Sequence, residues 1–550
     1  MDTHMMLSID YGTPMDDARH MIYHEIQQLE YGHQMLALRS QLNMFTYIAR
    51  VPPEILLQIF VAVTENGEWP ADSTQCIPVT HVCRQWRSIA LNAPALWSNL
   101  LSDNVAWTMA MLDRSKASPL TVSIHSSDAI PVLKHLSRIR SLTIEHWSAD
   151  DLQKLRVFIE ENASVAPQLE VLSLSSVSNS PWSLPSTTFQ QADRLKDLFL
   201  DGIQIDWTYS PFFRHLTKLR LQTILYDGQP TWRELITALD QMPALESLFI
   251  DNMLPKVTFD AALDAVSAYL PSLKSVGFRF VPTVHAMLAF LNQVNLPTGL
   301  KVFNVVNIDD SSNSQQIYEL CHAISRSIPG LCSRARYMDI MRPRVSSEIY
   351  IHCFATLQEF HRHGHLGWDW ERNPADIALR LSYLPELDRT MVVVTALDIL
   401  NLSHITYLSA SVSVGRPEFI ALLTGLPELQ VIQVCQRPTK HLVHALNTIQ
   451  PHGPREGALI LPKLREIHIC TDYFKAEDVL ITDDTWQDLK AFLEFRQSLQ
   501  AGVHKLYIRR CRHISREMVE GLKKCVDDLC WDGMCKEDPD PSRYEMSLRI

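Results

Sequence analysis

A short pattern of apolar positions recurs along most of the chain. Two apolar residues stand three positions apart and a third follows two positions later, with variable residues between them, as in Leu169, Leu172 and Leu174. Such alternation predicts a strand with one buried face. We call this pattern the strand cassette. Its copies begin at Ile139, Leu169, Leu195, Leu216, Leu245, Leu273, Leu300, Ile405, Leu429, Leu464 and Val503.

The spacing of the cassettes predicts a stacked repeat. The first seven begin 21 to 30 residues apart, and segments between them, such as 231–242 and 260–270, have helical periodicity. A proline often stands two residues before a cassette, as at Pro167 and Pro243, where it would end a helix and start a strand. A period of this length is typical of a solenoid whose unit is one strand and one return helix.

The rhythm of the cassettes breaks between Val305 and Ile405. Ala335, Met338 and Ile340 predict one strand inside this gap. One or two irregular repeats, or an insertion, must fill residues 341–400.

The first hundred residues have helical patterns instead. Residues 16–47 lack proline and predict an amphipathic helix, which either packs on the next segment or forms a short dimerising coiled coil. We expect the packed form and a monomer, with dimerisation left open. Residues 1–15 are expected to be disordered, and residues 536–550 to form a frayed tail. The helical stripe would consist of Ile22, Ile26, Leu29, Leu36 and Leu42.

Residues 48–101 predict a small helical module. Pro52 and Pro53 suit a helix start, and Glu54 lies in the first turn, where the helix dipole favours negative charge. A second helix follows, which Pro94 ends. The apolar stripes and the closing turn consist of Ile55, Leu56, Ile59, Phe60, Val82, Cys83, Trp86, Ile89, Leu96 and Trp97.

In order, the module contains Pro-Pro-Glu at 52–54, Val-Cys-x-x-Trp at 82–86 and Pro-x-Leu-Trp at 94–97. It resembles an F-box, in the form common among fungal, basidiomycete-type F-box proteins. Val51 stands where that family more often has Leu, and 67–73 form an insertion. The resemblance implies that the module binds a Skp adaptor and, through it, a cullin scaffold. The implied contact residues are Pro52, Pro53, Glu54, Ile55, Leu56, Ile59, Phe60, Val82, Cys83, Trp86, Ile89, Leu96 and Trp97.

The repeats of 102–535 resemble degenerate leucine-rich repeats. In that family the strand ends in an Asn or Cys that forms a ladder, whereas here the position is apolar, as at Trp147 and Met253. The expected fold is therefore mixed α/β: an all-α N-terminal part followed by an irregular solenoid with parallel strands. The middle positions of the cassettes face its concave side and would bind an unknown target protein. The candidates are Phe199, Phe249, Lys218, Arg220, Arg465 and His468. The two phenylalanines either anchor binding or pack under a neighbouring loop.

Composition narrows the functional class. A net charge of −12 argues against general nucleic-acid binding, which needs a basic surface. No apolar run is long enough to span a membrane, and the first twenty residues lack the apolar core of a signal peptide. Eleven scattered cysteines fit reduced thiols. We therefore expect a cytoplasmic or nuclear protein that binds neither nucleic acid nor membrane.

Catalytic motifs are lacking in the sequence, including a phosphate-binding glycine loop and a two-histidine zinc helix. His361, His363 and His365, and the run Cys525, Cys530 and Cys535, are candidate metal ligands by residue type. An exposed loop and a terminal cap explain them better, so we expect no enzyme, metal or cofactor.

Three hypotheses follow. The first is the substrate-recognition subunit of a Skp–cullin–F-box ubiquitin ligase. The second is a Skp-binding or repeat-scaffold protein with a structural role outside ubiquitylation. The third is an enzyme within 335–402, which only the histidine cluster supports.

Overall fold

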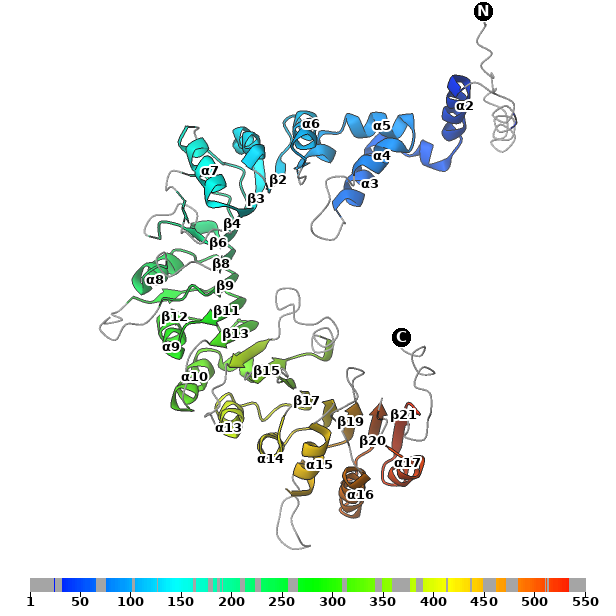
Figure 1. The fold of residues 1–550 in the computed structure, drawn as a ribbon, viewed down its shortest axis with the longest axis vertical. Coiled ribbons are helices and arrows are strands. Elements are labelled where there is room, and N and C mark those ends of the chain that lie inside the picture. Colours follow the sequence, from blue (N-terminus) through cyan, green and yellow to red (C-terminus); the bar gives the residue numbers. More distant parts are fainter. Residues whose placement is uncertain are drawn as a thin grey trace, which may run out of the picture. The chain divides into compact units, whose positions relative to one another are not determined.

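The structure is a computed structural model (Figure 1). It divides into two compact units, residues 1–205 and 206–550, which are described separately. Among the described residues no helix is both long and apolar enough to cross a membrane. The described residues are 24, 32–65, 76–100, 104–125, 127–161, 165–176, 182–184, 188–189, 191–207, 213–222, 229–255, 266–308, 314–341, 349–358, 376–381, 389–411, 414–435, 438–448, 461–470, 483–509, 511 and 514–533.

The first unit begins with short helices. Of the predicted helix 16–47, the structure shows residues 32–44; Leu42 is half-buried, whereas the side chains of the other stripe residues lie outside the described part of the chain. Residues 47–50 form a separate 3-10 turn. The elements are α2 (Gly32–Met44), η1 (Tyr47–Arg50), α3 (Pro53–Glu65), α4 (Cys76–His81), α5 (Arg84–Leu91) and η3 (Pro94–Trp97).

A parallel sheet completes the first unit, in the order β1-β2-β3-β4-β6. A separate two-strand pair, β5 with β7, is also parallel. The elements of the first unit after η3 are β1 (Asn99–Leu100), α6 (Val105–Ser115), β2 (Leu120–Ile124), η4 (Ser127–Arg138), β3 (Ile139–Trp147), α7 (Ala149–Glu161), β4 (Val171–Ser176), β5 (Trp182–Ser183), β6 (Asp197–Asp201) and β7 (Ile203–Gln204).

The second unit is a longer sheet with helices along one side (Figure 1). Most of its strands are parallel, and β10 pairs with β12 apart from the main sheet. Its elements are η5 (Phe213–His215), β8 (Lys218–Gln222), α8 (Trp232–Asp240), β9 (Ser247–Asp251), β10 (Ala268–Tyr269), β11 (Ser275–Val281), α9 (Val284–Gln293), β12 (Val294–Asn295), β13 (Val302–Ile308), α10 (Ser314–Ser327), α11 (Pro329–Cys332), β14 (Tyr337–Met341), β15 (Ile349–Phe354), β16 (Ile377–Leu381), α13 (Arg389–Ile399), β17 (Tyr407–Ser411), α14 (Arg416–Gly425), β18 (Val431–Cys435), α15 (Pro438–Thr448), β19 (Glu466–Cys470), α16 (Asp483–Ser498), β20 (Lys505–Arg509), α17 (Arg516–Lys523) and β21 (Asp528–Trp531).

Every strand cassette forms a strand, and its three apolar residues are buried. Most cassettes begin with the same turn, in which the first residue donates its N–H to the carbonyl three residues earlier. Leu169 donates to Ala166 at 3.2 Å, and Leu245 to Met242 at 3.1 Å. The turn satisfies polar backbone groups where the chain changes from helix to strand. The predicted α/β fold with parallel strands is confirmed.

Helices lie between several strands, as periodicity predicted. Thr231 caps α8 by accepting from the Glu234 amide, and the Glu234 carboxylate accepts from Thr231 in return. The expectation for 260–270 was wrong at its end, because Ala268–Tyr269 form β10 and pair with Val294–Asn295. Pairing with a distant strand overrides local helical periodicity there.

In the region where the spacing of the cassettes is irregular, three strands stand in the sheet in the reverse of their order in the sequence. The predicted strand at Ala335–Ile340 is present as β14, but it pairs with β17 rather than with β13. Strand β16 occupies the place beside β13, and β15 runs antiparallel between β16 and β14. The spatial order is thus β13-β16-β15-β14-β17. The predicted insertion is a meander inside a parallel sheet.

Apolar side chains occupy the positions where leucine-rich repeats have an Asn ladder. Trp147, Ile203, Met253, Val281 and Ile308 are all buried, whereas Val177 and Ile224 lie outside the described residues. The indole N–H of Trp147 donates to the Ile124 carbonyl at 3.1 Å, which joins β3 to the neighbouring β2. Apolar packing and this indole bond therefore connect successive turns in place of amide side chains.

Asp339 of β14 is a buried carboxyl group, and its protonation makes the stability of the second unit depend on pH. Burial raises the pKa of this carboxyl group to about 6, although a hydrogen bond from Ser409 acts in the opposite direction. The folded protein therefore retains a proton that the unfolded chain releases near pH 4. The stabilisation from this proton is complete below about pH 4 and is lost as the pH rises through about 6.

We expect Asp339→Asn to stabilise the second unit at pH 7.5 by on the order of 1–3 kcal/mol, with little effect at pH 4. Thermal unfolding measured at both pH values checks this expectation. Ser409→Ala removes the hydrogen bond and should increase the pH dependence. A variant whose pH profile parallels that of the original chain would contradict the assignment.

Candidate functional site

The core of the helical module consists of apolar side chains from α3 and the closing turn η3. Leu56, Phe60, Leu96 and Trp97 are buried. The Phe60 ring centroid lies 4.8 Å from that of Trp86, and the Trp97 indole donates to the Ala90 carbonyl at 2.8 Å. These contacts connect α3, α5 and η3 into one small domain.

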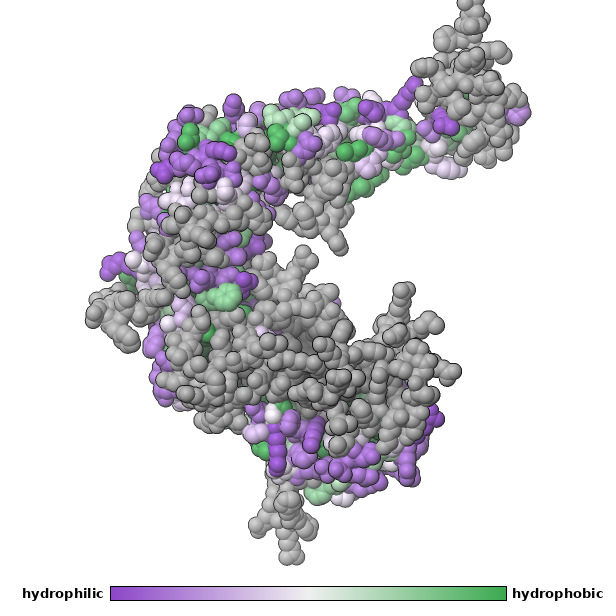
Figure 2. Space-filling view, viewed as in Figure 1, coloured by the Kyte–Doolittle hydropathy of each residue, from purple (hydrophilic) through white to green (hydrophobic). Residues whose placement is uncertain are grey.

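A second apolar surface of the module faces solvent. Ile55, Ile59 and Val63 follow one another at four-residue steps on α3, with exposed fractions of 44%, 42% and 58%. Val82, before α5, is 57% exposed. Figure 2 shows hydrophobic surface over α3. We call Ile55, Ile59, Val63 and Val82 the α3 face.

The predicted contact set therefore divides in two. Leu56, Phe60, Leu96 and Trp97 belong to the predicted contact set but are buried in the domain core of the free chain, so they support the surface from beneath. Cys83, Trp86 and Ile89 are half-buried, and the Cys83 sulfur caps α5 by accepting from the Trp86 amide at 3.5 Å. The exposed members are Pro52, Pro53, Glu54, Ile55, Ile59 and Val82.

Sequence reasoning missed other exposed apolar residues beside the contact set. Val63 continues the four-residue step from Ile59, so the helical period itself could have found it. Ile48 and Tyr47 of η1 are 43% and 79% exposed, and no periodic signal marks them. An exposed surface with this many apolar groups is typical of a protein interface.

The predicted target-binding residues lie on, or directly before, strands of both units. Phe199 is half-buried in β6, whereas Lys218 is exposed and Arg220 half-buried in β8. Phe249 was expected either to be an exposed anchor or to pack under a neighbouring loop, and it is only 6% exposed. A Cβ at Gly277 would lie 2.9 Å from Cδ2 of Phe249, so the ring packs over the glycine of the next strand.

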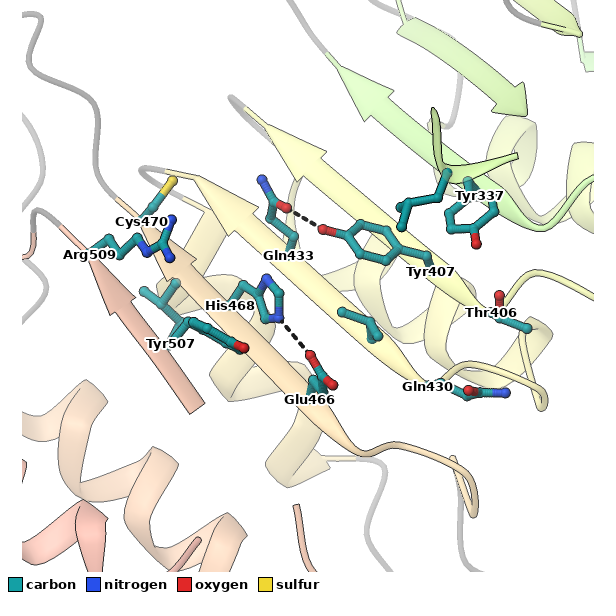
Figure 3. A pocket seen from close by; sticks show the side chains of 13 residues that line it. Tyr337, Thr406, Tyr407, Gln430, Gln433, Glu466, His468, Cys470, Tyr507 and Arg509 are labelled. Atoms are coloured by element: carbon teal, nitrogen blue, oxygen red, sulfur yellow. Dashed lines mark hydrogen bonds and ion pairs between the residues drawn. The ribbon is translucent and has the colours of Figure 1, made fainter. Parts of the chain in front are cut away.

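His468 and Arg465 lie in the second unit, and a cavity of about 620 Å³ surrounds His468 (Figure 3). Arg465 precedes β19 and is exposed, but it does not line the cavity. Tyr337, Tyr407 and Tyr507 line it from β14, β17 and β20, and His468 lies between the last two. We call these four residues the aromatic row. The sequence pattern did not single out the three tyrosines, although each lies on the side of its strand opposite the buried cassette residues.

Ring contacts connect the aromatic row. Centroids lie 5.9 Å apart between Tyr337 and Tyr407, 6.3 Å between Tyr407 and His468, and 4.2 Å between His468 and Tyr507. The Tyr407 hydroxyl donates to Gln433, and His468 Nε2 donates to Glu466 at 3.1 Å. Burial lowers the pKa of His468 below its ordinary value, so the imidazole is neutral near pH 7.

The candidate metal ligands remain largely unplaced. His361, His363, His365 and Cys535 lie outside the described residues. Cys525 is buried and Cys530 half-buried. Within the described residues, no group of three or more His, Cys, Asp or Glu side chains could hold a metal ion. The expectation of no metal stays a prediction.

Comparison with known proteins supports the sequence resemblance for the helical module. Residues 48–102 match the F-box-like family. The helical module is an F-box-like domain. The family match extends one residue beyond the predicted module and covers α3, α4, α5 and η3. The described α3 face is thus part of the F-box-like domain.

One solved structure similar to this chain is a leucine-rich repeat-containing protein, LegL7 from Legionella pneumophila. It is 11% identical, with a TM-score of 0.23, and the alignment covers 54% of this chain and 86% of that one. No curated protein matches the chain in sequence.

The division between core and face gives a stability test. Phe60→Ala should cost about 3–5 kcal/mol, because it removes a buried ring that packs on Trp86. Ile59→Ala on the same helix should change stability by less than about 0.5 kcal/mol, because its side chain faces solvent. Hydrogen exchange of α3 and α5 in the full chain checks both expectations. Equal protection in the two variants would contradict the division.

Proposed function

We propose that this protein is an F-box adaptor, the substrate-recognition subunit of a Skp–cullin–F-box ubiquitin ligase. The observation that carries the proposal is the solvent-facing α3 face inside a domain that matches the F-box-like family. F-box domains as a class bind Skp adaptors. In this chain Ile55, Ile59, Val63 and Val82 would be the apolar contacts, with Pro53 and Glu54 at the start of α3.

The chemistry of the α3 face suits a protein partner. Its side chains are aliphatic and have no polar groups to desolvate. Covering them with a complementary apolar surface is therefore favourable. Each fully buried aliphatic side chain contributes about 1.5–3 kcal/mol. The core residues Leu56 and Phe60 hold α3 in position but would not contact the partner. Replacement of Leu56 by Asp would therefore abolish binding by unfolding the domain.

The repeats would bind the target protein of the ligase. Repeats of this type present a sheet whose outward positions vary freely without loss of the buried cassette residues. The aromatic row and its cavity occupy such positions on β14, β17, β19 and β20. We propose that the target is brought to a cullin scaffold through the Skp adaptor, and that this chain performs no catalytic step and needs no cofactor.

We propose a cytoplasmic or nuclear site of action and a monomeric adaptor. Nine cysteines among the described residues are free thiols, which supports a reducing compartment. A short coiled coil through residues 16–47 would instead give a dimer. The molecular mass in solution of the full chain, compared with that of a chain lacking residues 1–44, distinguishes the monomer from the dimer.

Capture of a purified Skp adaptor tests the α3 face. We expect Ile55→Asp and Ile59→Asp in the full chain to weaken capture at least about thirtyfold, because each places a charge in a desolvated apolar contact. Val157→Asp is the matched control, since Val157 is 43% exposed on α7 and lies outside the F-box-like domain. Undiminished capture by both α3 variants would refute the proposed contact surface.

Assembly in cells separates a ligase subunit from a scaffold. We expect the full chain to co-precipitate a cullin, and expect a repeat-bound protein to accumulate when the proteasome is blocked. Both effects should disappear with Ile59→Asp and persist with Val157→Asp. Capture of the Skp adaptor without cullin or target accumulation would instead support a structural role outside ubiquitylation.

A further inference from the structure

The aromatic row lines an elongated cavity that crosses five neighbouring strands, β14, β17, β18, β19 and β20. Neighbouring strands lie about 4.8 Å apart, so the five strands span about 19 Å. An extended peptide rises about 3.3 Å per residue, and about six residues would cover this distance. The cavity therefore has the dimensions of a short peptide that lies across the strands.

The floor of the cavity is held in a fixed conformation by side-chain bonds. Tyr407 donates to Gln433, and His468 donates to Glu466 while its ring lies 4.2 Å from Tyr507 (Figure 3). Tyr337, Gln433, His468 and Tyr507 are all half-buried, so each is packed and still reaches solvent. Rigid tyrosines supply large contact area at low entropic cost, which is why they serve as binding anchors.

The charge of the cavity distinguishes between acidic and basic ligands. Its ionised groups are Glu466 and Arg509, since His468 is neutral near pH 7. The Glu466 carboxylate is already bound by His468, whereas Arg509 is exposed and forms no ion pair within the described part of the chain. Its guanidinium carbon lies 5.7 Å from the Tyr507 ring centroid.

Arg509 favours an anion at its own end of the cavity: it lies opposite Cys470 of β19, whereas the Glu466 carboxylate lies four residues earlier on that strand, opposite Lys505. A guanidinium near the Tyr507 ring already occupies the position that a cationic ligand would take in a cation–π contact. A lysine or arginine of a ligand would therefore be repelled by Arg509 at this ring. A carboxylate would instead form a charge-assisted hydrogen bond with the guanidinium.

We propose that the aromatic row binds an extended acidic peptide of the target protein, in which an aromatic side chain adjoins an aspartate or glutamate. The aromatic side chain packs among Tyr407, His468 and Tyr507, and the carboxylate meets Arg509. This inference rests on the proposed function only in naming the target as the source of the peptide. Peptide binding itself requires no Skp adaptor.

Selection of random hexapeptides on the full chain tests the proposal. We expect enrichment of sequences with an aromatic residue next to Asp or Glu. Arg509→Gln should weaken binding of a selected peptide at least about tenfold, and Arg509→Glu should shift selection toward aromatic residues next to Lys or Arg. Tyr507→Ala should also lose binding, because it removes a ring from the cavity.

Matched controls distinguish the cavity from general surface effects. Arg214→Gln, in η5, replaces another exposed arginine, and Tyr269→Ala removes a tyrosine that is 60% exposed in β10. Neither residue lines the cavity, and both variants should bind like the original chain. Enrichment of basic peptides, no enrichment at all, or equal binding by Arg509→Gln would overturn the proposal.

The Ile59→Asp variant separates this inference from the proposed function. It should lose capture of the Skp adaptor and keep peptide binding, whereas Arg509→Gln should show the reverse. If the original chain binds the peptide but does not capture the Skp adaptor, the adaptor function alone is refuted. Skp capture without selection of acidic aromatic peptides would refute the peptide site alone.

Discussion

The structure depends on burial of the cassette residues between the sheet and its covering helices. Every cassette places one apolar side chain at or just before the start of a strand and two on the same face of that strand, and all three are buried. A strand with one such row cannot bury it alone, so each repeat depends on the neighbouring repeats that cover it. The outward positions are free of this requirement, which is why the tyrosines of the aromatic row can serve another purpose.

The sequence predicted those parts of the fold that local patterns determine. Alternating apolar positions identified the cassette strands, because a one-residue shift would expose the whole row. The order β13-β16-β15-β14-β17 could not be predicted, because it depends on which distant backbone edges meet. Phe249 shows the same limit on a smaller scale: its burial depends on Gly277 in the neighbouring strand.

The F-box-like domain shows a different limit. Leu56 and Ile55 are neighbours in sequence and both aliphatic, yet one is buried and the other faces solvent. Helical periodicity identifies an apolar face, but it cannot divide a wide face into the part that packs on α5 and the part that receives a partner. Only the placement of Trp86 and Trp97 makes this division. The motif identified the domain, and the packing identified its surface.

The reversed strand order affects how the sheet of the second unit can form. A regular solenoid can grow one repeat at a time, because each new strand pairs with the one before it. Here β13 pairs with β11 but obtains its second neighbour only when β16 is available, about 70 residues later in the sequence, and β14 pairs in parallel only with the later β17. During synthesis, the sheet edge at β13 therefore stays open until residue 381 has emerged. The meander divides the growth of the sheet into two stages, with an exposed edge between them that a chaperone or another chain could pair with.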